Sequence, residues 1–98
     1  MIKSFRHKGL HAFFETGSKA KIQAAHATRL GLQLFALNRA TRPEDMNVPG
    51  WKLHPLSGSN PRGQGVAGYW SVSVNGNWRL TFYFEGQDAV LVDYQDYH

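Results

Sequence analysis

The chain changes its hydrophobic period part-way along. Before residue 40, apolar side chains recur at helical intervals in two stretches: Leu10, Phe13 and Phe14, then Ala27, Leu30, Leu34 and Leu37. This spacing lines one face of an α-helix, so it predicts two amphipathic helices. Gly17 is the predicted stop of the first helix, and Ser18 is the predicted cap of the second. Residues 41–50 are rich in helix breakers and end the helical half.

After residue 68, apolar and polar residues alternate, which is typical of strands with one buried face. The alternation predicts strands at residues 69–74, 78–85 and 89–95, with short extended segments at residues 2–5 and 51–56. The order of these elements predicts an α+β fold in a single domain, residues 1–98. We expect a small antiparallel sheet of four to five strands packed against two N-terminal helices.

The register of the central hairpin follows from its two faces. A two-residue Asn75-Gly76 loop would set Ser73 opposite Trp78 and so mix a polar face with an apolar one. A three-residue loop keeps the apolar residues together, pairing Val74 with Trp78, Val72 with Leu80, and Trp70 with Phe82. We therefore predict the three-residue loop. We expect the opposite face to stay open for function; it carries Tyr69, Ser71, Ser73, Arg79, Thr81 and Tyr83.

Composition narrows the classes of partner and chemistry. A net charge of +4 and a pI of about 9.7 favour polyanionic partners: RNA, DNA or an acidic protein. The chain has no cysteine, which excludes disulfides, thiolate metal sites and cysteine nucleophiles. This suits a reducing cytoplasm, where we expect the protein to act. The first residues contain no uninterrupted apolar run, so we expect neither a signal peptide nor a membrane span.

Two stretches match cofactor or metal motifs by their letters, but their surroundings do not fit such sites. Residues 63–68 match G-x-G-x-x-G, but a strand follows them instead of the helix that a dinucleotide site needs. His7 and His11 have the spacing of a helical metal clip, but no glutamate base lies between them, and we interpret them as exposed helix histidines. We therefore expect no cofactor and no metal.

The second half contains residue types suited to metal-free RNA cleavage. That reaction needs a base for the ribose 2′-hydroxyl, an acid for the departing 5′-oxygen, and a cation for the phosphate. Histidine transfers protons near neutral pH and arginine binds phosphate, so the candidates are His54, Arg79, Asp96, Tyr97 and His98. Taken alone, these residues also fit a turn histidine before a proline and a frayed chain end.

Five segments, in the same order along the whole chain, resemble HigB toxins of the RelE/ParE superfamily. They are residues 1–10 (with MIKSF and HKGL), 49–56 (PGWKLHPL), 68–74 (GYWSVSV), 77–82 (NWRLTF) and 93–98 (DYQDYH). The resemblance implies a RelE-like fold and a toxin that enters the ribosomal A site and cuts messenger RNA without a metal. It also implies a HigA-like helix-turn-helix antitoxin as the partner, which a basic toxin would attract through acidic segments.

The resemblance also implies roles for the candidate residues. The catalytic group of the family is a histidine in Leu-His-Pro-Leu together with a C-terminal Asp-Tyr-His, here His54 with Asp96, Tyr97 and His98. The histidines would transfer protons, with either one as the base, and Asp96 would polarise or position one of them. Tyr97 would stack on the substrate or hydrogen-bond to it. The cations expected to bind RNA are Arg79, Arg62 and Lys52.

This chain departs from the family pattern in one loop. Many relatives have a basic residue followed closely by Gly-Tyr-Trp, whereas here Ser57 begins a longer loop that runs through residue 67. Arg62 is the candidate to restore the lost charge. Two alternative functions remain: a ParE-like toxin that inhibits DNA gyrase without being an enzyme, and a degenerate domain that binds an antitoxin or nucleic acid. The first would not need His54 with the terminal Asp-Tyr-His, and the second would leave growth unaffected.

Overall fold

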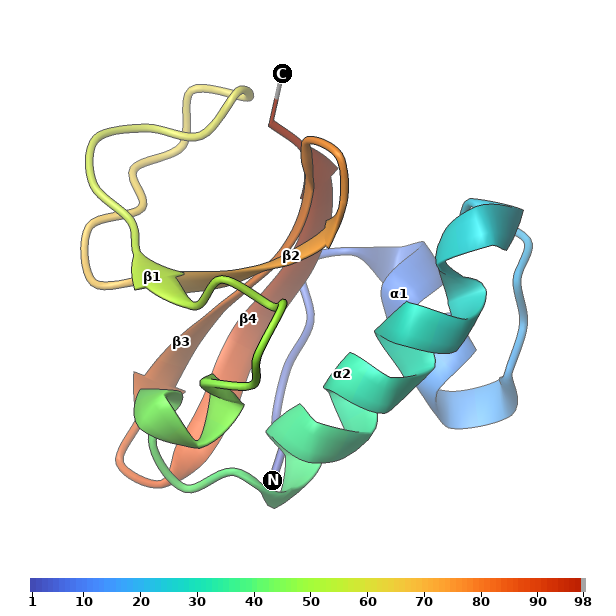
Figure 1. Ribbon diagram of the computed structural model, residues 1–98, viewed down its shortest axis with the longest axis horizontal. Coiled ribbons are helices and arrows are strands. Elements are labelled where there is room, and N and C mark those ends of the chain that lie inside the picture. The colour runs from blue at the N-terminus through green and yellow to red at the C-terminus, as the bar shows by residue number, and fades with distance from the viewer. Residues whose placement is uncertain (98) are drawn as a thin grey trace.

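Two α-helices pack against one face of a four-stranded antiparallel sheet in the computed structural model, which describes residues 1–97 (Figure 1). The sheet order is β1-β2-β3-β4, so each strand pairs with its neighbour in the sequence. The elements are α1 Lys8–Thr16, the 3₁₀ helix η1 Ala24–His26, α2 Ala27–Arg39, the 3₁₀ helix η2 Pro43–Met46, β1 His54–Pro55, β2 Trp70–Asn75, β3 Trp78–Glu85 and β4 Asp88–Asp96. The predicted α+β fold is confirmed.

Both predicted helices are present, and their apolar stripes join the core. α1 ends at Gly17, whose φ of 79° is the left-handed conformation of a glycine C-cap, as predicted. The stripe of α2 is buried at Leu30, Leu34 and Leu37. Among residues 1–97, no helix has the length and apolar character needed to cross a membrane.

The predicted start of the second helix at Ser18 is wrong. α2 begins only at Ala27, after η1, and the chain before it follows a turn closed by the bond from the Ile22 N–H to the Lys19 carbonyl. Contacts with the distant Tyr94 fix this geometry: its hydroxyl lies 2.6 Å from Nδ1 of His26 and accepts from the Gln23 N–H. Tertiary contacts therefore override the local capping signal.

The hairpin of β2 and β3 has the predicted register along its body but a different turn. The apolar pairs of the body are confirmed: Trp70 with Phe82, and Val72 with Leu80. At the turn, Asn75 lies opposite Trp78 in place of the predicted Val74. A two-residue turn at Gly76-Asn77 matches the twist of the strands, and a bulge at Val74 absorbs the extra residue. Val74 nevertheless stays buried, so the apolar face is preserved.

The N-terminal segment runs parallel to β4 along its outer edge. The strand predicted at residues 2–5 is reduced to two isolated bridges, Ile2 with Ala89 and Phe5 with Val92. Between these two bridges, β4 has a bulge at Leu91, whose φ is 55°. The Leu91 N–H donates to the hydroxyl of Ser4 at 2.9 Å. The extended stretch predicted at residues 51–56 is a strand only at β1, His54–Pro55. Backbone hydrogen bonds continue on both sides of it, from the Ser73 N–H to the Trp51 carbonyl and from the Leu56 N–H to the Tyr69 carbonyl.

The middle of the sheet face opposite the helices is covered, which corrects the prediction of an open face. Its buried polar residues are Ser71, Thr81, Asp93 and Gln95. The loop of residues 57–68 leaves β1 and returns to β2 on the side away from α1 and α2 (Figure 1), and its Val66 is buried. Exposed residues remain at the rim of this face, where His54 is exposed and Arg79 half-buried.

We expect the stability of the fold to fall as the pH is lowered, because burial lowers the pKa of His26 below its ordinary value of 6.5. The unfolded chain then takes up a proton more readily than the folded protein, so this contribution is present above pH 6.5 and lost below it. The free energy of unfolding in urea, measured from about pH 7 to about pH 5, should decrease. His26→Gln should reduce the decrease, and an equal loss in both proteins would contradict the assignment.

Candidate active site

His54 lies at the exposed edge of the sheet with its imidazole in a defined orientation. Nδ1 is 2.9 Å from the carbonyl oxygen of Lys52. Because a carbonyl only accepts, this hydrogen bond places a proton on Nδ1 and leaves the lone pair of the neutral ring on Nε2. Nε2 faces the hydroxyl of Ser71 at 3.4 Å. His54 therefore presents a proton-accepting nitrogen on the side of the sheet away from the helices.

The backbone of Lys52 supplies this orientation through an unusual conformation. Its φ is 55°, which side-chain-bearing residues rarely adopt, and its carbonyl is the one that His54 contacts. The Lys52 side chain is exposed, as expected of a cation predicted to bind RNA. The backbone role was not predicted, because the sign of φ at a lysine leaves no signal in the sequence.

One row of paired residues crosses all four strands on the site face. His54 pairs with Ser71, Ser71 with Thr81, and Thr81 with Asp93. Neighbouring strands lie about 4.8 Å apart, so the backbones of His54 and Asp93 are separated by roughly 14 Å. A substrate that contacts both edge strands must therefore span the sheet.

Tyr97 follows β4 directly, and its side chain lies near Asp93 and Arg79 of the same face. Its N–H donates to the Asn77 carbonyl at 2.8 Å, which extends the ladder by one residue. Its hydroxyl is buried and has no hydrogen-bond partner among residues 1–97. Burial, and then the nearby Asp93, raise the pKa of Tyr97, while Arg6 and Arg79 oppose them. The phenol therefore stays protonated and can donate a hydrogen bond.

Asp96 belongs to the other face of the sheet. It pairs with Trp78, whose ring packs against Tyr94 and His26 on the helix side. Strand alternation therefore separates Asp96 from His54, and the Lys52 carbonyl orients that imidazole instead. The predicted role of Asp96 in positioning a histidine is then limited to His98, which lies outside the described residues.

Both arginines predicted to bind RNA lie near the site face. Arg79 shares a row with Ser73 and Gln95, and its Nη1 donates to the carbonyl oxygens of Gly76 at 2.9 Å and Trp78 at 3.2 Å. Arg62 is exposed on the loop of residues 57–68. Burial lowers the pKa of His7, Asp93 opposes this shift, and the charge of Arg62 adds to it, so Arg62 lies near the residue that caps the start of α1.

Sequence reasoning missed three residues that surround the site. Arg6 donates to the hydroxyl of Tyr69 at 2.8 Å and to Oε1 of Gln64 at 3.2 Å. His7 is half-buried and caps α1 by accepting the Leu10 N–H, so it is not the exposed helix histidine that we predicted.

Asp93, the third of these residues, is buried on the site face of β4. It is only 2% exposed and accepts from its neighbours, the Tyr94 N–H at 2.8 Å and Nε2 of Gln95 at 2.6 Å. The alternation of apolar and polar residues in β4 could have indicated which face Asp93 occupies. The bulge at Leu91, however, changes which residues of β4 point to each face. The sequence gives no indication of that change.

Comparison with known proteins decides the family. A family model described as the RelE-like toxin of the type II toxin–antitoxin system HigB matches residues 3–98. The chain belongs to the HigB-like toxins. The Endoribonuclease HigB of Proteus vulgaris is 43% identical over 98 residues, which cover 100% of each chain. These matches confirm the resemblance noted in the sequence. The residues matched by the family model include each of the site residues described above.

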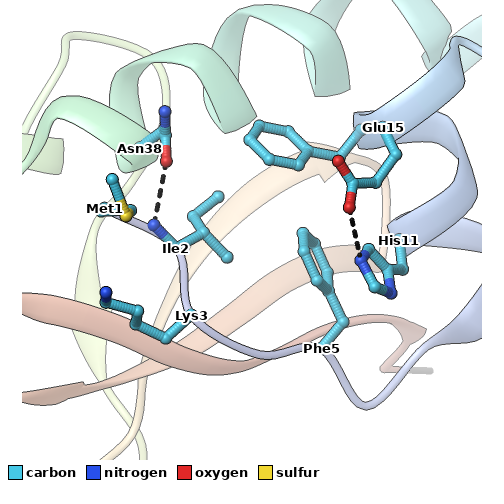
Figure 2. Close-up of a pocket in the computed structure, with 8 residues that line it drawn as sticks. Met1, Ile2, Lys3, Phe5, His11, Glu15 and Asn38 are labelled. Carbon is cyan, nitrogen blue, oxygen red and sulfur yellow. Dashed lines mark hydrogen bonds and ion pairs between the residues drawn. The ribbon is translucent and has the colours of Figure 1, made fainter.

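A hollow of about 320 Å³ in this HigB-like toxin lies apart from the predicted site, between the N-terminal segment and the helices (Figure 2). Phe5 stacks on His11 there, and His11 pairs with Glu15 at 3.2 Å. The hollow shares no residue with the predicted site. His11 faces this hollow while Nδ1 of His7 is bonded to the helix backbone, so the two rings serve different contacts.

The site of the HigB-like toxin combines three chemical capacities along one face. His54 offers an oriented proton acceptor, Tyr97 a protonated hydroxyl, and Arg79 and Arg62 permanent positive charge. Among residues 1–97, no cluster of three or more histidine or carboxylate side chains is placed to hold a metal ion. What the described residues supply is acid–base chemistry next to a polyanion.

Proposed function

We propose that this HigB-like toxin is an endoribonuclease that cuts messenger RNA in the ribosomal A site and so inhibits translation. The observation that carries the proposal is the imidazole of His54, held by the Lys52 carbonyl so that Nε2 is the basic nitrogen. The relative from Proteus vulgaris bears the name Endoribonuclease, which supports the same reaction class.

In the proposed reaction, Nε2 of His54 removes the proton of a ribose 2′-hydroxyl, and the oxygen attacks the adjacent phosphorus. The bond to the 5′-oxygen breaks, and an acid protonates that oxygen, leaving a 2′,3′-cyclic phosphate and a 5′-hydroxyl end. The candidate acid is His98. Tyr97, whose phenol stays protonated because burial raises its pKa, would stack on the substrate or hydrogen-bond to it. Arg79 stabilises the charge on the phosphate, with Arg62 and Lys52 on the flanking backbone.

The proposed partners follow from the same surface. A toxin of net charge +4 fits the polyanionic A site and messenger RNA, and acidic segments of a HigA-like helix-turn-helix antitoxin. Both targets place its action in the cytoplasm. None of the proposed steps requires a metal ion, since His54 and the arginines supply the proton acceptor and the charge.

Purified toxin should cut a messenger RNA on translating ribosomes at least about tenfold faster than the same RNA alone, because the A site aligns the scissile bond. The measurement is the rate of appearance of new 5′ ends in a reconstituted translation mixture. A second RNA without a ribosome-binding site, present in the same mixture, is the matched control. Equal cleavage of both RNAs would contradict ribosome dependence, and intact transcripts with arrested DNA replication would favour a gyrase inhibitor.

A further inference from the structure

The loop of residues 57–68 is folded around one buried side chain. Asn60 is 6% exposed, and its Oδ1 accepts the N–H groups of Arg62 at 3.0 Å and Gln64 at 2.9 Å. The Asn60 backbone closes the turn, since its N–H donates to the Gln64 carbonyl and its carbonyl accepts from Gly63. These bonds hold Arg62 at the tip of a defined turn.

Arg6 connects this turn to the sheet. Its N–H donates to Val92 of β4, while its guanidinium donates to Oε1 of Gln64 and to the hydroxyl of Tyr69 beside β2. The same Oε1 of Gln64 accepts from Nδ2 of Asn60 at 2.8 Å. A chain of hydrogen bonds therefore runs from the β4 edge, through Arg6, into the centre of the turn.

Further contacts fix the direction of the Arg6 side chain. Its guanidinium carbon lies 5.1 Å from the centre of the Tyr69 ring, which packs on Tyr83 at 5.3 Å. No ion pair of Arg6 with a carboxylate occurs among residues 1–97, so its hydrogen bonds to neutral groups hold it in place. The contacts explain how a loop that begins at the β1 edge is held from the β4 side.

We propose that Arg6 is a positioning residue that ties the loop of residues 57–68 across the site face, so that Arg62 is held where it binds the RNA backbone. The inference rests on the proposed function for its RNA ligand. The tether itself stands on the contacts of Arg6, Gln64 and Asn60 and can be tested without any activity.

The tether is tested by limited digestion with trypsin, which cuts after Arg62 in the tip of the loop. Arg6→Met keeps an unbranched apolar stem but removes the donors of the guanidinium, and we expect cleavage between Arg62 and Gly63 to become about tenfold faster. Arg42→Met is the control, because Arg42 pairs with Asp45 at the exposed η2 turn. Unchanged cleavage of the Arg6 variant would overturn the proposal.

The action of Arg6 through Arg62 is tested by a double-mutant cycle on ribosome-bound messenger RNA. Arg6→Met and Arg62→Gln should each raise KM about fivefold with little change in kcat, because each loses one phosphate contact. If Arg6 acts through Arg62, the double variant should be no worse than Arg6→Met alone. Multiplying effects on KM would overturn the proposal.

The two proposals fail in distinguishable ways. If the wild-type toxin cleaves no RNA, the proposed function is contradicted. The trypsin digestion of the Arg6 variant still supports or overturns the tether in that case. His54→Ala should reduce cleavage of RNA by about 10²- to 10⁴-fold and leave the rate of digestion after Arg62 unchanged.

Discussion

Replacing His54 by alanine should reduce messenger RNA cleavage by about 10²- to 10⁴-fold, the range that a general base contributes. The side chain is exposed, and within residues 1–97 it makes hydrogen bonds to the Lys52 carbonyl and the Ser71 hydroxyl, so little stability is lost with it. We expect single-turnover cleavage on programmed ribosomes to fall by this factor. After brief induction in cells, mapping of 5′ ends should show the new ends only with the wild-type toxin.

His11→Ala is the matched control for this prediction. His11 is exposed and pairs with Glu15 at the opposite end of α1 from the cap, outside the predicted site. Its loss should leave the cleavage rate within about twofold, since exposed pairs contribute little. A His54→Ala toxin that still arrests growth and cuts RNA at the wild-type rate would remove His54 from the mechanism.

Phe82→Ala should destabilise the fold by about 3–5 kcal/mol, the cost of emptying a phenylalanine site in a packed core. Phe82 is 0% exposed, pairs with Trp70 across the hairpin and meets the ring of Phe84 edge-on. A domain has about 5–15 kcal/mol of stability in total, so a large part of it would be lost. Urea denaturation measures the change.

Phe35→Ala gives the reference for that measurement. Phe35 is 62% exposed on α2, so its truncation should change the free energy of unfolding by less than about 0.5 kcal/mol. If the two variants were equally stable, the placement of Phe82 in the core would be wrong. Phe82→Ala also separates two ways of losing toxicity, because it destabilises the fold whereas His54→Ala leaves the stability nearly unchanged.

The elements of the fold were predictable because they depend on local periodicity. The stripe at Leu30, Leu34 and Leu37 and the alternation of β2 and β3 survive in the structure. The start of α2 was not predictable, since it depends on Tyr94, which lies 68 residues beyond His26 and contacts it. The bulges at Val74 and Leu91 could not be predicted either, because the two-residue alternation of a strand does not show where an extra residue is inserted.

The site was predictable in its residue types but less so in its geometry. Histidine, arginine and tyrosine identify the chemistry wherever they lie, and the family resemblance selected His54 and Tyr97. The orientation of His54 depends on a positive φ at Lys52. The placement of Arg62 depends on the contact of Arg6 with Gln64, which lies 58 residues further along the chain. Such relations arise only when the chain is folded.

The position of β4 has a consequence for the timing of synthesis. This strand pairs on one side with β3 and on the other with residues 2–6, and it supplies Tyr94 to the base of α2. A nascent chain that lacks residues 88–96 is missing the backbone partners of Lys3 and Arg6 and the contact between His26 and Tyr94. We therefore expect the sheet face that carries the proposed site to be completed only after β4 has left the ribosome.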